Sequence, residues 1–99
     1  MKLIFSQAAW ADYLYWQATD VDVLKRVNEI IRDTLRSPFS GIGKPEPLVG
    51  QYKGSWSRRI TREHRFIYRV SGQGESQALE IAACRFHYKL PPRTSALRS

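Results

Sequence analysis

Three groups of side chains in this sequence have the types and spacing for acid–base chemistry on a phosphate ester. The first is Glu46, which stands between Pro45 and Pro47 and two residues after Lys44. Flanking prolines restrict the backbone to extended conformations and so hold the carboxylate in a narrow range of positions. A rigid surface turn explains the same pattern equally well, and the local sequence does not decide between the two interpretations.

The second group is the arginine-rich segment "WSRRITREHRFIYR", residues 56–69. Its spacing predicts a hairpin of two strands that turns at residues 62–64. Apolar residues 66, 68 and 70 predict the core face of the second strand, so Arg65 and Arg69 should face the open side. Arg59 should join them there, whereas Arg58 falls on the side of Trp56. A solvated basic face is the alternative to an anion site.

The third group is "CRFHY", residues 84–88, which follows an apolar run. A single histidine near a strand end is usually an ordinary surface residue, but His87 could share a cleft with Glu46 and the arginines. In a regular strand His87 and Tyr88 point to opposite sides. Both can serve one site only if the chain kinks there, which the end of a strand allows.

A carboxylate, an imidazole and several guanidinium groups match metal-free cleavage of RNA. The ribose 2′-OH attacks the adjacent phosphorus when a base takes its proton, and an acid protonates the departing 5′-oxygen. Acid–base catalysis of this kind contributes about 10²- to 10⁴-fold, and arginine supplies fixed positive charge for the transition state. No metal or other cofactor is expected, because the sequence has neither a paired-carboxylate nor a His/Cys spacing typical of a metal site.

The distribution of charge predicts a polyanionic partner for the second half of the chain. Residues 1–43 contain five basic and five acidic side chains, so the whole formal charge of +7 comes from residues 44–99. Eight of the eleven basic residues in that half are arginine, which suits bidentate phosphate contacts. Nucleic acid is the commonest such partner. A solubilising surface is the alternative, but it predicts scattered charge.

The 99 residues are enough for one domain with one core. No apolar run is long enough to span a membrane, and the single cysteine, Cys84, indicates a reducing cytoplasm. Within an apolar strand Cys84 is expected to be a core residue rather than a nucleophile. We expect one domain over residues 1–88 and a disordered tail over residues 89–99.

Helical periodicity predicts helices over 7–18, capped by Ser6, and from Asp20 to the stop at residues 37–38, with Asp33 on the polar face of the second. Residues 2–5, 56–61, 65–70 and 77–88 have strand character, and the proline- and glycine-rich residues 37–56 predict an irregular connection. Helices followed by strands indicate an α+β fold, with a helical hairpin packed on one face of a small antiparallel sheet.

Long blocks of the sequence resemble the YoeB family of toxins, in the RelE/ParE superfamily: "MKLIFS", "DYLYWQ", "PFSGIGKPEPL", "WSRRITREHRFIYRV" and "IAACRFHY". The resemblance implies a microbial-ribonuclease-like fold and a ribosome-dependent mRNA interferase, which cuts mRNA in the A site and stops translation. It implies Glu46 as general base, His87 as general acid and Arg65 on the scissile phosphate. The residues that it implies for placing the RNA are Lys44, Arg59 and Tyr88.

The resemblance also implies a partner, a YefM-like antitoxin with an acidic, partly disordered segment, and homodimers occur in the family. Val49 departs from the family pattern, in which a basic residue stands near the active site. His64, in the predicted hairpin turn, is either structural or in contact with RNA. Two alternatives remain open: a non-catalytic toxin of the ParE-like branch, which lacks the combination of Glu46, Arg65 and His87, and an RNA-binding domain without catalysis.

Overall fold

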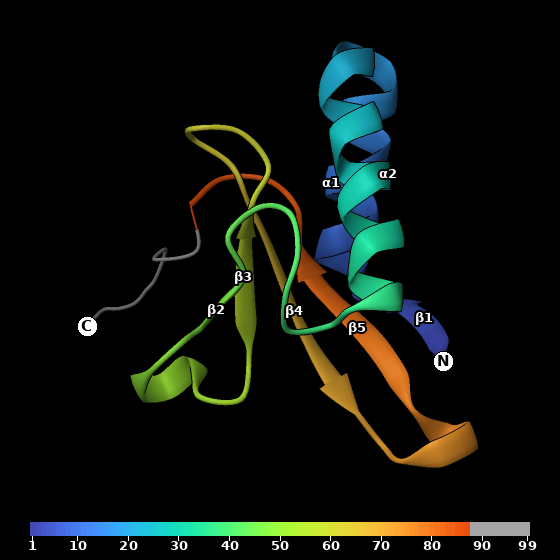
Figure 1. The fold of residues 1–99 in the computed structure, drawn as a ribbon. Helices are drawn as coiled ribbons and strands as arrows, with labels where there is room; N and C mark the ends of the chain where they lie inside the picture. The colour runs from blue at the N-terminus through green and yellow to red at the C-terminus, as the bar shows by residue number, and fades with distance from the viewer. Residues whose placement is uncertain (88–99) are drawn as a thin grey trace.

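The computed structural model describes residues 1–87. Its helices and strands, in chain order, are β1 (Lys2–Phe5), α1 (Gln7–Thr19), α2 (Val21–Arg36), β2 (Glu46–Pro47), β3 (Trp56–Arg59), β4 (Arg65–Ser71) and β5 (Ala78–Ala83). Short 3-10 turns lie at Gly50–Tyr52 and Gly74–Ser76. The α+β prediction is confirmed, with both helices on the same side of the sheet (Figure 1). The expected tail falls outside the described residues.

The two predicted caps define the helical hairpin. The Ser6 hydroxyl accepts a hydrogen bond from the N–H of Ala9 at 3.0 Å and begins α1. The Asp20 carboxylate accepts from the N–H groups of Asp22 and Val23, both at 3.2 Å, and begins α2. Because Asp20 also ends α1, a single residue forms the joint between the helices, which are therefore antiparallel neighbours.

The sheet has five strands in the order β1-β5-β4-β3-β2. The pairs β2/β3, β3/β4 and β4/β5 are antiparallel, but β1 pairs with β5 in parallel. The sheet is therefore mixed rather than wholly antiparallel as expected. Hydrophobic alternation can predict that residues 2–5 form a strand, but it carries no information on the direction of the neighbouring strand.

One core lies between the helices and the sheet. Its buried residues are Ala9, Trp16, Val27, Ile30, Ile31, Ile60, Phe66, Tyr68, Leu79, Ile81 and Cys84. The predicted core face of β4 is confirmed for Phe66 and Tyr68, which are both fully buried. Asp33 was expected on the polar face of α2 and is instead buried, because it pairs with a buried arginine from β3.

The last strand ends at Ala83, five residues earlier than the predicted segment 77–88. A bulge in the β4/β5 pairing shifts the register at Ile67 and Tyr68, so that Ile67 lies opposite Ala83 and Tyr68 opposite Ile81. Bulges bend the strand that contains them and often end its pairing. The described backbone beyond Ala83 makes most of its hydrogen bonds with side chains of other elements.

Candidate active site

A cleft of about 230 Å³ lies where the ends of β2, β3 and β4 meet the residues after β5. Its lining residues are Lys44, Glu46, Ser57, Arg59, Arg65 and His87. The strand register explains this grouping, because Glu46 is paired with Ser57 and Arg59 is paired with Arg65. Directly paired residues point to the same side of a sheet, and so do residues two apart on one strand.

The structure thus brings five of the six predicted site residues into one cleft; the sixth, Tyr88, lies outside the described residues. Arg69, which was expected on the same open side, is exposed but lies away from this cleft. Its Nε donates to Glu80 Oε1 at 3.2 Å. Among the lining residues, Lys44, Arg59 and Arg65 are basic and Glu46 is the one carboxylate. The basic side chains favour the binding of an anion, and the carboxylate can take a proton from it.

Arg65 is held in place by its own hairpin. Its Nη1 donates to the backbone carbonyls of Thr61, Arg62 and His64 at 2.9, 3.1 and 3.1 Å. These bonds orient the planar guanidinium without neutralising it, because carbonyl groups carry no net charge. A fixed and fully charged group of this kind suits electrostatic stabilisation of a phosphate.

The segment of residues 37–47, which we call the Glu46 segment, carries Lys44 and Glu46 to the cleft. It wraps around the fully buried side chain of Arg58. The Nη1 of Arg58 donates to Asp33 Oδ2 at 2.8 Å and to the carbonyl of Ile42 at 3.1 Å. Its Nη2 donates to the carbonyls of residues 37 and 40 at 2.6 and 2.9 Å. One guanidinium therefore fixes three points of the segment.

Asp33 completes this buried cluster from α2. Its Oδ2 also accepts the N–H of Ile42 at 3.0 Å. The Ile42 N–H and the guanidinium of Arg58 both lower the pKa of the Asp33 carboxyl below its usual value. Removing one partner of a buried ion pair leaves an uncompensated charge and typically costs about 3–5 kcal/mol. The position of the Glu46 segment consequently depends on an ionic pair beneath the cleft.

Glycine is required where the Glu46 segment passes over this pair. A Cβ at Gly41 (φ 114°) would overlap Asp33 Oδ2, and a Cβ at Gly43 (φ 80°) would lie 3.1 Å from the carbonyl oxygen of Arg59. The next residue, Lys44, has φ 52° although it is not glycine. Non-glycine residues in this region are strained, and such residues cluster at functional sites.

Residues 84–87, which we call the His87 segment, are held mainly by side chains of α1 and of the β3–β4 turn. Asp12 Oδ2 accepts the N–H of Cys84 at 3.0 Å, and Trp16 Nε1 donates to the Cys84 carbonyl at 2.8 Å. The N–H of Phe86 donates to His64 Nδ1 at 2.8 Å. Partial burial raises the pKa of Asp12 despite its backbone hydrogen bond.

The backbone kinks at Phe86, immediately before His87. The φ of Phe86 is 65°, in the left-handed region that side chains other than glycine rarely adopt. Its N–H is held by His64 and its carbonyl accepts from the N–H of Arg65 at 2.9 Å. The turn is therefore fixed on both sides of Phe86, and the next residue is His87.

Cys84 is a core residue, as predicted. It is fully buried, and burial raises the pKa of its thiol to about 12. A thiol with such a pKa carries almost no thiolate at neutral pH and is a poor nucleophile.

Sequence reasoning did not assign Ser57 or Arg58 to the site, and it left two interpretations of His64 open. Ser57 lines the cleft, and strand alternation had placed that residue beside Arg59. Arg58 lies under it, and the apolar neighbours on its side of β3 were a signal of burial. His64 accepts a hydrogen bond from the His87 segment, which is a structural role, and its contact with RNA stays a prediction. No local signal predicted its hydrogen bond to Phe86.

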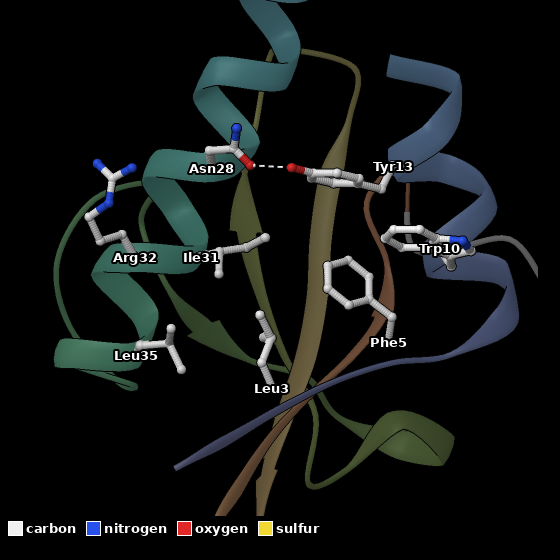
Figure 2. Close-up of a pocket in the computed structure, with 8 residues that line it drawn as sticks. All are labelled: Leu3, Phe5, Trp10, Tyr13, Asn28, Ile31, Arg32 and Leu35. Atoms are coloured by element: carbon white, nitrogen blue, oxygen red, sulfur yellow. Dashed lines mark hydrogen bonds between the residues drawn. The ribbon is translucent and has the colours of Figure 1, made fainter. Parts of the chain in front are cut away.

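A second, larger hollow of about 460 Å³ lies between β1, α1 and α2 (Figure 2). Its lining residues are Leu3, Phe5, Trp10, Tyr13, Asn28, Ile31, Arg32 and Leu35. The Tyr13 hydroxyl donates to Asn28 Oδ1 at 2.8 Å across it. Apart from these polar groups and Arg32 the lining is apolar, and it offers no carboxylate or imidazole for acid–base chemistry.

Residues 1–87 contain no group of three or more His, Cys, Asp or Glu side chains arranged to hold a metal ion. Neither helix in this part of the chain is long and apolar enough to cross a membrane.

The fold and the cleft can now be compared with known proteins. A family model described as YoeB-like toxin of bacterial type II toxin-antitoxin system matches residues 5–88. Toxin YoeB of Escherichia coli is 57% identical over 88 residues, which cover 89% of this chain and 100% of that protein.

Solved structures agree with this likeness. The YoeB/ParE toxin from Agrobacterium tumefaciens has a TM-score of 0.86 and 56% identity, over 89% of this chain and 100% of that one. YoeB of Staphylococcus aureus, in a heterotetrameric YoeB–YefM complex, has a TM-score of 0.78 and 38% identity, over 89% and 98% of the chains. It has also been solved as a dimer. The protein is thus a toxin of the type II toxin–antitoxin class. Within that class it belongs to the YoeB-like family.

Proposed function

We propose that this toxin is an endoribonuclease that cuts mRNA in the ribosomal A site and thereby stops translation. The observation that carries the proposal is the cleft itself, in which Glu46, Arg65 and His87 line one space of about 230 Å³. Base, cation and acid are the three groups that metal-free RNA cleavage needs.

The proposed roles are those that membership of the YoeB-like family implies, and the chemistry of each side chain fits its role. Glu46 takes the proton of the 2′-OH, and the rigid backbone around it fixes the direction of that transfer. Arg65, which its hairpin carbonyls orient, stabilises the negative charge that grows on the phosphate oxygens. His87 delivers a proton to the departing 5′-oxygen.

Lys44 and Arg59 contact the flanking phosphates from the same cleft, and Tyr88 follows His87 in the chain. Arginine and lysine contacts of this type position the RNA backbone without reading its sequence. Dependence on the ribosome is proposed from family membership together with the basic second half of the chain, which suits an RNA-rich surface.

An acidic antitoxin related to YefM is the proposed protein partner. The S. aureus relative is found with YefM, and the formal charge of +7 favours an acidic chain. A homodimer, like that of the same relative, is a further proposed assembly.

The test is primer extension on translated mRNA with wild-type protein and with Glu46→Gln, Arg65→Met and His87→Ala. Wild type should cut within ribosome-occupied codons, and each variant should lose at least about 100-fold in rate while it stays folded by circular dichroism.

Arg69→Met is the matched control for Arg65→Met, because Arg69 lies on the same strand and side of the sheet but pairs with Glu80. It should cut at close to the wild-type rate. Cleavage that persists in His87→Ala, or equal toxicity of His87→Ala and wild type, contradicts the proposal and favours a non-catalytic binding toxin.

A further inference from the structure

We infer that His64 is a positioning residue for His87: it accepts the N–H of Phe86 and thereby holds the kink that turns His87 into the cleft. The inference rests on the proposed function, since it concerns the placement of the proposed general acid. His64 itself is not among the residues that line the cleft. It acts through the backbone of the His87 segment.

The direction of the hydrogen bond defines the state of the imidazole. A backbone N–H can only donate, so His64 Nδ1, at 2.8 Å from the Phe86 nitrogen, must accept. The ring is therefore the neutral tautomer with its proton on Nε2. A protonated ring would present a second donor to the Phe86 N–H and could not make this bond.

His64 is itself firmly held, which makes it able to position another residue. Its carbonyl accepts from the N–H groups of Ile60 and Thr61 at 2.9 and 3.3 Å, and its N–H donates to the Thr61 hydroxyl at 3.2 Å. Its ring lies edge-on to the buried ring of Trp16, with centroids 4.8 Å apart. The backbone and the ring of His64 are thus both held by contacts that do not involve Phe86.

The kink needs such a support because it is unfavourable by itself. Phe86 has φ 65°, a conformation that costs a residue with a side chain about 1–2 kcal/mol. Its side chain is 55% exposed, so packing of the phenyl ring does not compensate fully. Two backbone hydrogen bonds oppose relaxation: the Phe86 N–H donates to His64 Nδ1, and the Phe86 carbonyl accepts from the N–H of Arg65. Without the His64 acceptor the segment should relax toward extended backbone and move the His87 ring.

The test compares two substitutions that remove different properties of the imidazole. His64→Phe keeps a ring against Trp16 but has no acceptor. His64→Asn places an amide oxygen at the position of Nδ1 but removes most of the ring. Glu63→Gln, at the exposed neighbouring position of the same turn, is the matched control.

The first measurement is the cleavage rate on mRNA-programmed ribosomes. We expect kcat to fall about 10- to 100-fold in His64→Phe, because a misplacement of about 1 Å can cost 10²-fold. KM should change less than about threefold, since the cationic lining of the cleft is intact. His64→Asn should recover at least about half of the lost activity on a logarithmic scale, and Glu63→Gln should match wild type. A folded His64→Phe with wild-type kcat, or a His64→Asn no better than His64→Phe, overturns the inference.

The second measurement is NMR spectroscopy of the ¹⁵N-labelled full-length chain and does not depend on activity. Wild type should show a coupling between His64 Nδ1 and the Phe86 nitrogen through the hydrogen bond, with slow exchange of the Phe86 amide. His64→Phe should show faster exchange of that amide and shifted His87 resonances, and His64→Asn should reverse both changes. If wild type fails to cut mRNA, the proposed function fails, and these spectra alone decide on the positioning: absence of the coupling in wild type overturns it.

Discussion

The two segments that meet in the cleft are each tied to a helix by a carboxylate, yet the two carboxylates differ in their electrostatics. Asp33 of α2 accepts the N–H of Ile42 in the Glu46 segment, and Asp12 of α1 accepts the N–H of Cys84 in the His87 segment, both at 3.0 Å. The pKa of Asp33 is lowered, whereas the pKa of Asp12 is raised.

Two groups mainly lower the pKa of Asp33: the N–H of Ile42, which has the larger effect, and the buried guanidinium of Arg58, which is bonded to Asp33 at 2.8 Å. Asp12 also accepts a backbone N–H, and Arg85 acts on it at longer range, but desolvation outweighs both and raises its pKa. The pKa values of the two carboxylates therefore shift in opposite directions because desolvation is the largest effect on Asp12 but not on Asp33.

The two segments are also held in place in different ways. The Glu46 segment depends on the buried ion pair of Arg58 and Asp33. Loss of Arg58 would also remove the donor to the carbonyls of residues 37 and 40. The His87 segment depends on single hydrogen bonds, each of smaller energy: one donated by Trp16, and two that His64 and Asp12 accept. We therefore expect substitutions under Glu46 to act on global stability, and substitutions under His87 to act more locally.

The largest expected effect is that of Arg58→Met. It leaves Asp33 buried without its cation and several carbonyls without a donor, so the free energy of unfolding should fall by about 3–5 kcal/mol. The neighbouring variant Arg59→Met, at an exposed position, should change it by less than about 0.5 kcal/mol. Urea denaturation of both variants gives the comparison; equal stability of the two would show that the buried pair does not hold the fold.

Acid should weaken the Glu46 segment. Because the pKa of Asp33 is lower in the folded state than the unfolded value near 3.9, the unfolded chain takes up the proton first. The free energy of unfolding should fall as the pH drops below about 4, by no more than the cost of losing the pair.

Asp33→Asn should be less stable than wild type at neutral pH. Its free energy of unfolding should also depend less on pH below about pH 4. Asp12→Asn should behave differently, because the raised pKa of Asp12 means that the folded state takes up that proton first. Losing Asp12 should therefore steepen the fall in stability on acidification or leave it unchanged. Urea titrations at a series of pH values measure these slopes, and a flattened slope in Asp12→Asn would contradict the comparison.

A smaller loss of stability is expected from Trp16→Phe. The substitution keeps an aromatic ring in the core but removes the Nε1 donor to the Cys84 carbonyl. A buried acceptor left unsatisfied costs about 1–3 kcal/mol. Hydrogen exchange should show the loss concentrated in residues 84–87 rather than in the Glu46 segment. Uniform loss of protection across the sheet would mean that the His87 segment is not a separate unit.

The smallest effect has the opposite sign. Lys44→Gly should raise the free energy of unfolding by up to about 1 kcal/mol, because glycine adopts a φ of 52° without strain. The same variant should cut mRNA more slowly if Lys44 contacts the RNA. Thermal unfolding and the cleavage assay together separate strain from binding; a less stable variant would show that the lysine side chain supports the fold.

Much of the architecture could be predicted from the sequence because it depends on local patterns. Ser6 and Asp20 cap the helices at the predicted residues, and the turn at residues 62–64 joins the strands that flank it. Strand alternation put Arg59 and Arg65 on the open side, where both line the cleft. The roles of these residues in catalysis, and that of Tyr88, remain predictions.

The sequence by itself determined which residues are helical, which strand faces are apolar, and that most of the positive charge lies in the second half of the chain. These properties depend on the types and spacing of residues that are close together in the sequence. Only the tertiary structure decided that β1 lies parallel to β5, that Asp33 is buried beside Arg58, and that His64 holds Phe86. Each of these contacts joins residues at least 22 positions apart. The energy of each depends on the burial of polar groups and on the direction of their hydrogen bonds, which no local sequence pattern encodes.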